Sequence, residues 1–120
     1  MEPNFKINWC KHFPPKGYIA ITLFNNVIFR CESQEEFDRL IESDYGKSVI
    51  NHERIHVIQG KTLGWFKFYC LYFNYYIIGR IRGLSHDEAY YNIPFEREAY
   101  ANEDNPYYNQ TQWESYIVYD

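Results

Sequence analysis

The sequence predicts an α+β domain that is mostly helical and carries a β-hairpin near its N-terminus. The early stretch GYIAITLFNNVIFRC is rich in β-branched and aromatic residues on both sides of an Asn-Asn pair, which is typical of a hairpin. After it, apolar residues recur at helical spacing behind capping residues. The 120 residues suffice for one modest core, so a single domain is expected over residues 1–120.

The N-terminal elements are predicted first. The opening 16 residues are expected to form an irregular arm, because Pro14 and Pro15 exclude a regular helix there. The hairpin should run from about Tyr18 to Cys31. Its tight turn is expected at Asn25-Asn26, a pair that tolerates positive φ.

Two helices are predicted after the hairpin. Ser33 and Glu36 form a capping-box pattern, so a short helix should run from about Gln34 to Ser43. Ser48 is expected to cap the next helix, which should stop or bend near Gly60.

The most apolar stretch, KTLGWFKFYCLYFNYYIIGR, is predicted to be a buried central helix. Its core, Leu63 to Gly79, counts 17 residues interrupted by Lys67 and Asn74, which is the lower limit for spanning a bilayer. These two polar residues share one helix face and leave a broad apolar surface for packing. The alternative is insertion of this helix into a membrane surface.

The C-terminal part is predicted to contain one more helix. Arg80 to Asn92 should form a loop or a frayed segment, since it contains Gly83 and Ser85. Pro94 fits the first turn of a helix with the sequence PFEREAYANE. The later segment WESYIVY is compatible with a short strand or with a helical turn.

Composition limits the classes of function. The net charge of −4 argues against a nucleic-acid-binding protein. Half of the 16 acidic residues fall between Asp87 and Asp120, where Arg97 is the only basic residue, so this part should carry a negative field. Such a field suits a cation site, and a solvated acidic tail explains it equally well.

The three cysteines and the N-terminus bear on the compartment. Cys10, Cys31 and Cys70 are an odd number without CxxC spacing, which indicates neither a disulfide framework nor a cysteine zinc site. The first residues lack the pattern of a signal peptide. A cytoplasmic protein with reduced thiols is therefore expected.

The stretch NHERIHVIQG contains a candidate metal site. On a helix, His52 and His56 lie four residues apart on one face and can direct two imidazole nitrogens at one point. Zinc accepts such nitrogens and, in catalytic sites, takes a third protein ligand. Glu53 would then act as the general base that takes a proton from the attacking water and passes it to the leaving amine.

The third ligand must come from another segment. The longer motif HExxHxxGxxH is excluded, because Gln59 and Thr62 occupy the glycine and third histidine positions. The later PFEREAY helix offers Glu96 and Glu98. Two residues on a helix are about 200° apart, so only one of these carboxylates can face the metal.

These motifs resemble those of the gluzincin metallopeptidases. His52-Glu53-xx-His56 followed by Glu96-xx-Ala99 is similar to the CAAX-prenyl-protease and HtpX-like group, whose later helix carries Glu-xx-Ala-Asp. NHERIHVIQ and FEREAYANE also resemble short, uncharacterised bacterial zincin-like proteins. The resemblance covers about 20 residues and implies a minimal zincin-like domain, a Zn²⁺ cofactor and Glu96 as the third ligand.

The resemblance also suggests roles for neighbouring residues. Glu98 would turn outward or shape the acidic field. Tyr100 stands where the related group has an aspartate that orients a ligand histidine, and its hydroxyl could do this more weakly. Arg54 places a charge where these helices usually have uncharged residues.

Other candidates for the site have competing interpretations. His86 could stabilise an oxyanion, whereas a loop histidine is more often simply solvated. His12 has no partner visible in the sequence and is taken as structural. The strand YIAITLF could hold an extended peptide or merely cover the core.

The sequence thus predicts a zinc-dependent metallopeptidase that hydrolyses a peptide or protein substrate. His52, His56 and Glu96 would bind the metal, and Glu53 would be the catalytic base. The alternative is a non-catalytic, zinc-stabilised binding or interaction module, with or without membrane association.

Overall fold

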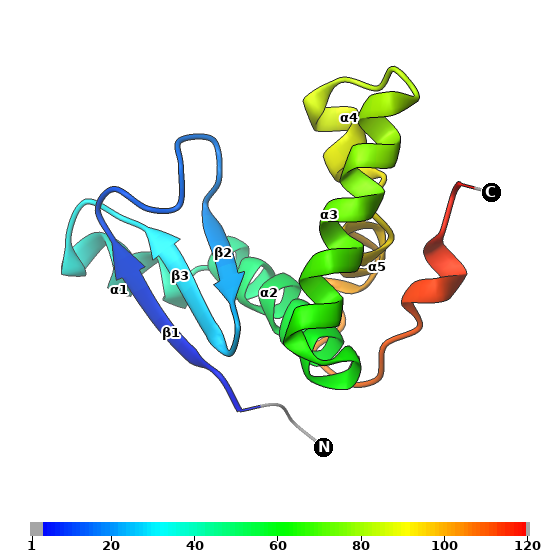
Figure 1. Ribbon diagram of the computed structural model, residues 1–120. Helices are drawn as coiled ribbons and strands as arrows, with labels where there is room; N and C mark the ends of the chain where they lie inside the picture. The colour runs from blue at the N-terminus through cyan, green and yellow to red at the C-terminus, as the bar shows by residue number, and fades with distance from the viewer. Residues whose placement is uncertain (1–3, 120) are drawn as a thin grey trace.

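The computed structural model describes residues 4–119, which form the predicted α+β fold (Figure 1). Three strands come first and five α-helices follow. The elements are β1 (Lys6–Cys10), β2 (Ala20–Leu23), β3 (Asn26–Arg30), α1 (Gln34–Glu42), α2 (Asp44–Leu63), α3 (Trp65–Ile81), α4 (His86–Tyr91), α5 (Pro94–Asn102) and the 3₁₀ turn η1 (Trp113–Tyr116). The predicted N-terminal hairpin is confirmed as β2 and β3, which pair antiparallel.

The sheet contains a strand where an irregular arm was predicted. β1 pairs parallel with β3, so the strand order is β1-β3-β2 and β2 is an edge strand. Along the N-terminal segment, half-buried Phe5, Ile7 and Trp9 alternate with exposed Lys6 and Asn8. This alternation is the pattern of a strand with one face on a core. The prediction was wrong here because the two prolines exclude a helix but do not exclude a strand that ends before them.

The hairpin turn lies one residue earlier than predicted. Leu23 pairs with Asn26, so Phe24 and Asn25 form the turn, and Phe24 takes the positive φ of 56°. The Phe24 ring packs at 5.7 Å from both Trp65 and Tyr69, measured between ring centroids. Tertiary contacts therefore set the turn register against the local preference of the Asn-Asn pair.

The boundaries of the first two helices differ in detail from the prediction. The first helix is confirmed, but α2 begins directly after Ser43, whose side chain accepts a hydrogen bond from the Gly46 amide at 2.9 Å; Ser48 lies inside the helix. α2 also continues past Gly60 to end at Leu63, and the capping residue Gly64 has a φ of 88°. Gly60 instead permits close approach of Trp65, because a Cβ atom there would lie 2.1 Å from the indole ring.

α3 is not the buried helix that was predicted. Among its residues only Phe68 and Gly79 are buried. Phe66, Phe73 and Ile81 are 85%, 64% and 79% exposed. The helix packs through one face only, and no helix in residues 4–119 is long and apolar enough to cross a membrane.

The region after α3 is more regular than predicted. The segment expected as a loop contains α4, because Ser85 and Glu88 form a reciprocal capping box. The helix that begins with Pro94 is confirmed as α5. The undecided tail segment contains a 3₁₀ turn.

Two apolar clusters flank α2. The first joins the sheet to α1 and α2 through Val27, Phe29, Cys31, Phe37 and Val57. The second joins α3 to α5 through Phe68, Ile93 and Phe95. In Figure 1, α2 runs between the sheet and the helices α3 and α5, and every residue from 51 to 60 is buried. The HExxH motif therefore lies at the junction of the two clusters.

Candidate metal centre

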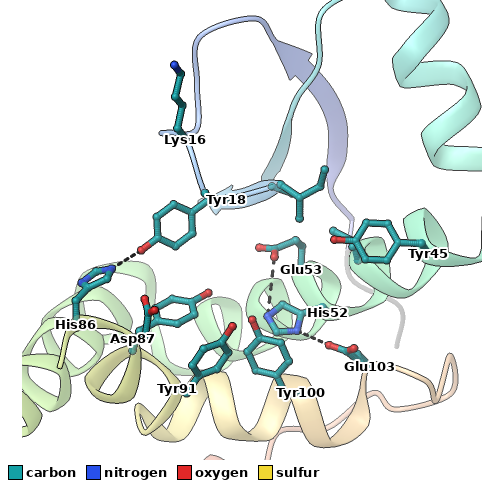
Figure 2. Close-up of a pocket in the computed structure, with 15 residues that line it drawn as sticks. Lys16, Tyr18, Tyr45, His52, Glu53, His86, Asp87, Tyr91, Tyr100 and Glu103 are labelled. Carbon is teal, nitrogen blue, oxygen red and sulfur yellow. Dashed lines mark hydrogen bonds and ion pairs between the residues drawn. The ribbon is translucent and has the colours of Figure 1, made fainter. Parts of the chain in front are cut away.

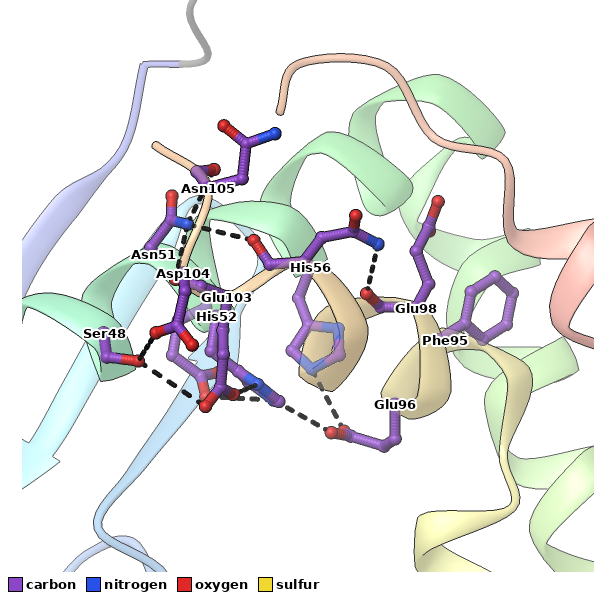
Figure 3. Close-up of polar contacts among 12 residues, drawn as sticks. Ser48, Asn51, His52, His56, Phe95, Glu96, Glu98, Glu103, Asp104 and Asn105 are labelled. Atoms are coloured by element: carbon purple, nitrogen blue, oxygen red, sulfur yellow. Dashed lines mark hydrogen bonds and ion pairs between the residues drawn. The ribbon is translucent and has the colours of Figure 1, made fainter. Parts of the chain in front are cut away.

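The structure brings His52, His56 and Glu96 together. The two imidazole rings come from successive turns of α2, with centroids 4.9 Å apart, and Glu96 reaches them from α5 (Figure 3). Nε2 of His52 lies 3.0 Å from one Glu96 oxygen, and Nε2 of His56 lies 3.0 Å from the other. All three side chains are buried. Helix geometry thus places two nitrogens and one carboxylate around a common point.

The other ring nitrogen of each histidine faces an acceptor. Nδ1 of His56 lies 2.8 Å from Oε1 of Gln59, while the amide group of Gln59 donates to Glu98 at 2.7 Å and to the Phe95 carbonyl at 3.0 Å. Because the Gln59 nitrogen is used in this way, its oxygen must accept from His56 Nδ1. Nδ1 of His52 lies 2.9 Å from a Glu103 oxygen and donates in the same manner.

These contacts leave both Nε2 atoms with a lone pair when the rings are neutral. Nε2 of His56 is buried and makes no hydrogen bond to any residue in the described part of the chain. Two lone pairs and a carboxylate in one buried place require a positive charge between them. A metal ion or added protons can supply that charge.

A buried cluster of His52, Glu53 and His56 could hold a metal ion, since their ligand atoms lie within 4.8 Å of one another. Glu53 differs from the other two in its contacts. Its carboxylate accepts a hydrogen bond from the Thr22 hydroxyl at 2.8 Å and lies 4.0 Å from Nε2 of His52. Burial raises the pKa of Glu53 above its ordinary value, although both histidines oppose the shift.

The electrostatics of the metal-free site couple Glu96 to the histidines. Burial disfavours a protonated His56, but the negative charge of Glu96 outweighs it and raises the His56 pKa to about 9. Burial likewise disfavours the ionised Glu96, yet the histidines hold its pKa well below the ordinary value. Glu96 also accepts a hydrogen bond from the Tyr72 hydroxyl at 2.6 Å. The site therefore favours an ionised carboxylate facing a positive charge.

Glu103 is held in place by polar residues of α2. Asn51 donates to the carbonyl oxygens of Glu103 at 2.7 Å and Asn105 at 3.0 Å (Figure 3). Arg54 donates to the Tyr108 carbonyl at 2.6 Å. The charge of Arg54, which departs from the related motifs, thus fixes the chain after α5 on the surface of α2.

Two residues have other positions than the resemblance implied. Glu98 does not turn outward: it is wholly buried and accepts hydrogen bonds from Gln59, the Thr111 hydroxyl at 2.6 Å and the Gln112 amide. Its partners lie in the C-terminal segment, which covers this side of α5. Tyr100 packs its ring against His52 at 4.4 Å, while Glu103 contacts the Nδ1 atom that an aspartate would orient.

Two cavities open beside Glu53. One of about 410 Å³ is lined by His52, Tyr91 and Tyr100 among others (Figure 2). The other, of about 270 Å³, is more apolar and is lined by His56, Phe68, Tyr69 and Tyr72 among others. A substrate in either cavity would therefore reach the candidate site.

The remaining histidines lie apart from His52 and His56. His86 lines the wall of the larger cavity, where one ring nitrogen contacts the Tyr18 hydroxyl at 2.7 Å (Figure 2). Its other ring nitrogen contacts the Tyr76 hydroxyl at 2.9 Å. It is thus linked to two tyrosines rather than simply solvated. His12 is exposed in the loop after β1.

In comparisons with protein-family models, with curated proteins and with solved structures, nothing matches this chain.

Proposed function

We propose that the protein is a zinc-dependent metallopeptidase in which His52, His56 and Glu96 hold Zn²⁺. The observation that supports this proposal most directly is the arrangement of the two histidines. In each ring the buried Nε2 atom lies 3.0 Å from a Glu96 oxygen, while Nδ1 contacts an acceptor. Imidazole nitrogen and carboxylate oxygen are ligands that suit zinc, and acceptors on Nδ1 are the usual support for ligand histidines. When bound, zinc would supply the Lewis acidity that polarises a carbonyl group and acidifies a water molecule.

Glu53 is proposed to move the proton. Its carboxylate lies beside the ligand histidines and faces both cavities, and the Thr22 hydroxyl holds one of its oxygens. A buried carboxylate with a raised pKa is a stronger base than an exposed one, which suits a group that takes a proton from water and passes it to the leaving amine. This role needs Glu53 free of direct metal coordination.

The edge strand β2 offers a place for an extended peptide. The Ile19 carbonyl accepts from the Arg30 amide, so odd-numbered residues direct their backbone groups at β3 and even-numbered ones at the open side. The Tyr69 hydroxyl takes up part of this side by contacting the Thr22 carbonyl and the Phe24 amide. The backbone groups of Ala20 remain directed at the open side beside Glu53, where a substrate backbone could pair with them.

The test compares Glu53→Gln with His52→Ala, using a fluorescein-labelled casein as the probe and elemental analysis for zinc. We expect Glu53→Gln to lose at least about a hundredfold in hydrolysis while keeping its zinc, because a base is removed and no ligand is lost. His52→Ala should lose both zinc and hydrolysis. Wild-type protein that binds zinc but hydrolyses no peptide bond at any pH would favour the non-catalytic binding module instead.

A further inference from the structure

The outward face of α3 carries an exposed apolar stripe. We define the outer stripe as Phe66, Cys70, Phe73, Ile77 and Ile81, which recur every three or four residues and so share one face of the helix. Phe66 is 85% exposed, Phe73 64% and Ile81 79%. The side chains of α3 that pack in the second apolar cluster, such as Phe68 and Tyr72, lie on the other face of the helix.

The inner face of α3 already supplies its packing within the domain. Phe68 packs on Phe95 at 4.9 Å between ring centroids, and Gly79 lies close against Ala89. A helix that is apolar on every side usually has both faces covered. A stripe of exposed aromatic residues on a helix whose other face is packed indicates an interaction surface for a binding partner or a membrane.

The charges beside the outer stripe indicate the chemistry of the surface that it would contact. Residues 65–86, which comprise α3 and the turn after it, contain no Asp or Glu but three basic residues, although the whole chain has a net charge of −4. Two of the three, Lys67 and Arg80, lie on opposite sides of the outer stripe on the helix surface. Long basic side chains that flank an apolar stripe can extend to anionic headgroups while the stripe enters the lipid boundary.

A second copy of this chain fits the outer stripe less well. Because α3 has no acidic residue, pairing two copies through the stripe offers no opposite charge from α3 to either Lys67 or Arg80. Anionic lipid complements both basic residues at once.

We infer that the outer stripe docks the protein on an anionic membrane surface, with α3 lying in the plane of the interface. Phe24, 55% exposed, contacts Tyr69, and Tyr69 lines the smaller cavity beside the candidate site. Aromatic surface thus continues from the turn between β2 and β3 through Tyr69 of α3 into that cavity. Docking would hold this cavity close to the lipid boundary.

The test measures co-sedimentation of the full chain, with and without added Zn²⁺, with phosphatidylcholine vesicles and with phosphatidylcholine–phosphatidylglycerol vesicles. We expect binding to the anionic vesicles that weakens as salt is raised. The double variant Phe66→Ser, Phe73→Ser should bind at least about tenfold more weakly, since two exposed rings lose their burial in lipid. Tyr107→Ser is the matched control, because Tyr107 is also 85% exposed but lies in the C-terminal segment.

Several outcomes overturn the inference. These are no binding to anionic vesicles, equal binding by the double variant and the wild type, or a wild-type dimer that the double variant abolishes. Far-ultraviolet circular dichroism of the variants confirms that the exposed substitutions leave the fold intact. The result is independent of the proposed peptidase, because a failure to bind vesicles with zinc-dependent hydrolysis intact would remove the docking inference alone.

Discussion

At the scale of single residues, the informative feature is the way His56 is fixed on both sides. Gln59 accepts from Nδ1, and Glu96 lies 3.0 Å from Nε2. In the metal-free protein a proton on Nε2 resolves the contact between two acceptors, which is why the pKa of His56 rises to about 9 despite burial. A metal ion at the same place must displace that proton.

The zinc affinity of the protein should therefore depend on pH more steeply than that of an ordinary histidine site. Below a pKa of about 9 His56 is mostly protonated, so affinity should rise about tenfold for each pH unit between about 6.5 and 8.5. An ordinary histidine would give a flat profile over the upper part of this range. The measurement is competition with a chelator whose own pH dependence is known. A constant affinity across the range would show that His56 carries no proton in the metal-free protein.

At the scale of elements, α5 presents two buried carboxylates in opposite directions. Glu96 faces the histidines of α2, whereas Glu98 faces Gln59 and the C-terminal segment. Glu98 thus attaches that segment to the helix and, through Gln59, supports the orientation of His56. Loss of Glu96 and loss of Glu98 should therefore have different effects on zinc binding and on stability.

Exchanging each glutamate for glutamine separates these roles. Glu98→Gln should lower the free energy of unfolding by about 2–4 kcal/mol, because an amide cannot accept from all the donors that converge there, yet the variant should still bind zinc stoichiometrically. Glu96→Gln should lose zinc on gel filtration, because a ligand is removed. Denaturant unfolding and elemental analysis measure the two effects. Zinc lost from the Glu98 variant and retained by the Glu96 variant would reverse the ligand assignment.

Some of these elements were predictable from local sequence patterns and others were not. The hairpin, α1, α2 and α5 were predictable because each has a local signal: alternation around a turn, a capping residue, or a proline at a helix start. The capping box of α4 is an equally local signal, although the prediction for this segment was a loop. In contrast, the strand β1 and the turn at Phe24 depend on partners distant in the chain, which no local pattern reveals.

The same division holds for the candidate site. The spacing of His52 and His56 and the two candidate carboxylates on the later helix were readable from the sequence. The supporting residues were not, since Thr22, Glu103 and Tyr72 reach the site only through the tertiary fold. Helix periodicity offered the third ligand as a choice between two residues. The fold brings Glu96, rather than Glu98, to the histidines.

At the scale of the whole molecule, the candidate site joins the two apolar clusters. α2 contributes Val57 to the cluster around the sheet, while α5 contributes Phe95 to the cluster around α3. His52 and His56 on α2 and Glu96 on α5 therefore belong to opposite sides of this junction. A metal ion held by all three would link the two halves of the domain.

Chelation should consequently destabilise the whole domain rather than one loop. A ligand that binds only the folded chain stabilises it by about 4 kcal/mol when its free concentration is about 1,000 times the dissociation constant. We expect thermal unfolding of the zinc-loaded protein to remain a single transition that moves to lower temperature after treatment with a chelator. Added Zn²⁺ should restore it and Mg²⁺ should not, since magnesium prefers oxygen ligands. The His52→Ala variant, which lacks one imidazole, is the control and should unfold at the same temperature with and without chelator. An unchanged transition in the wild-type protein would mean that no metal links α2 to α5.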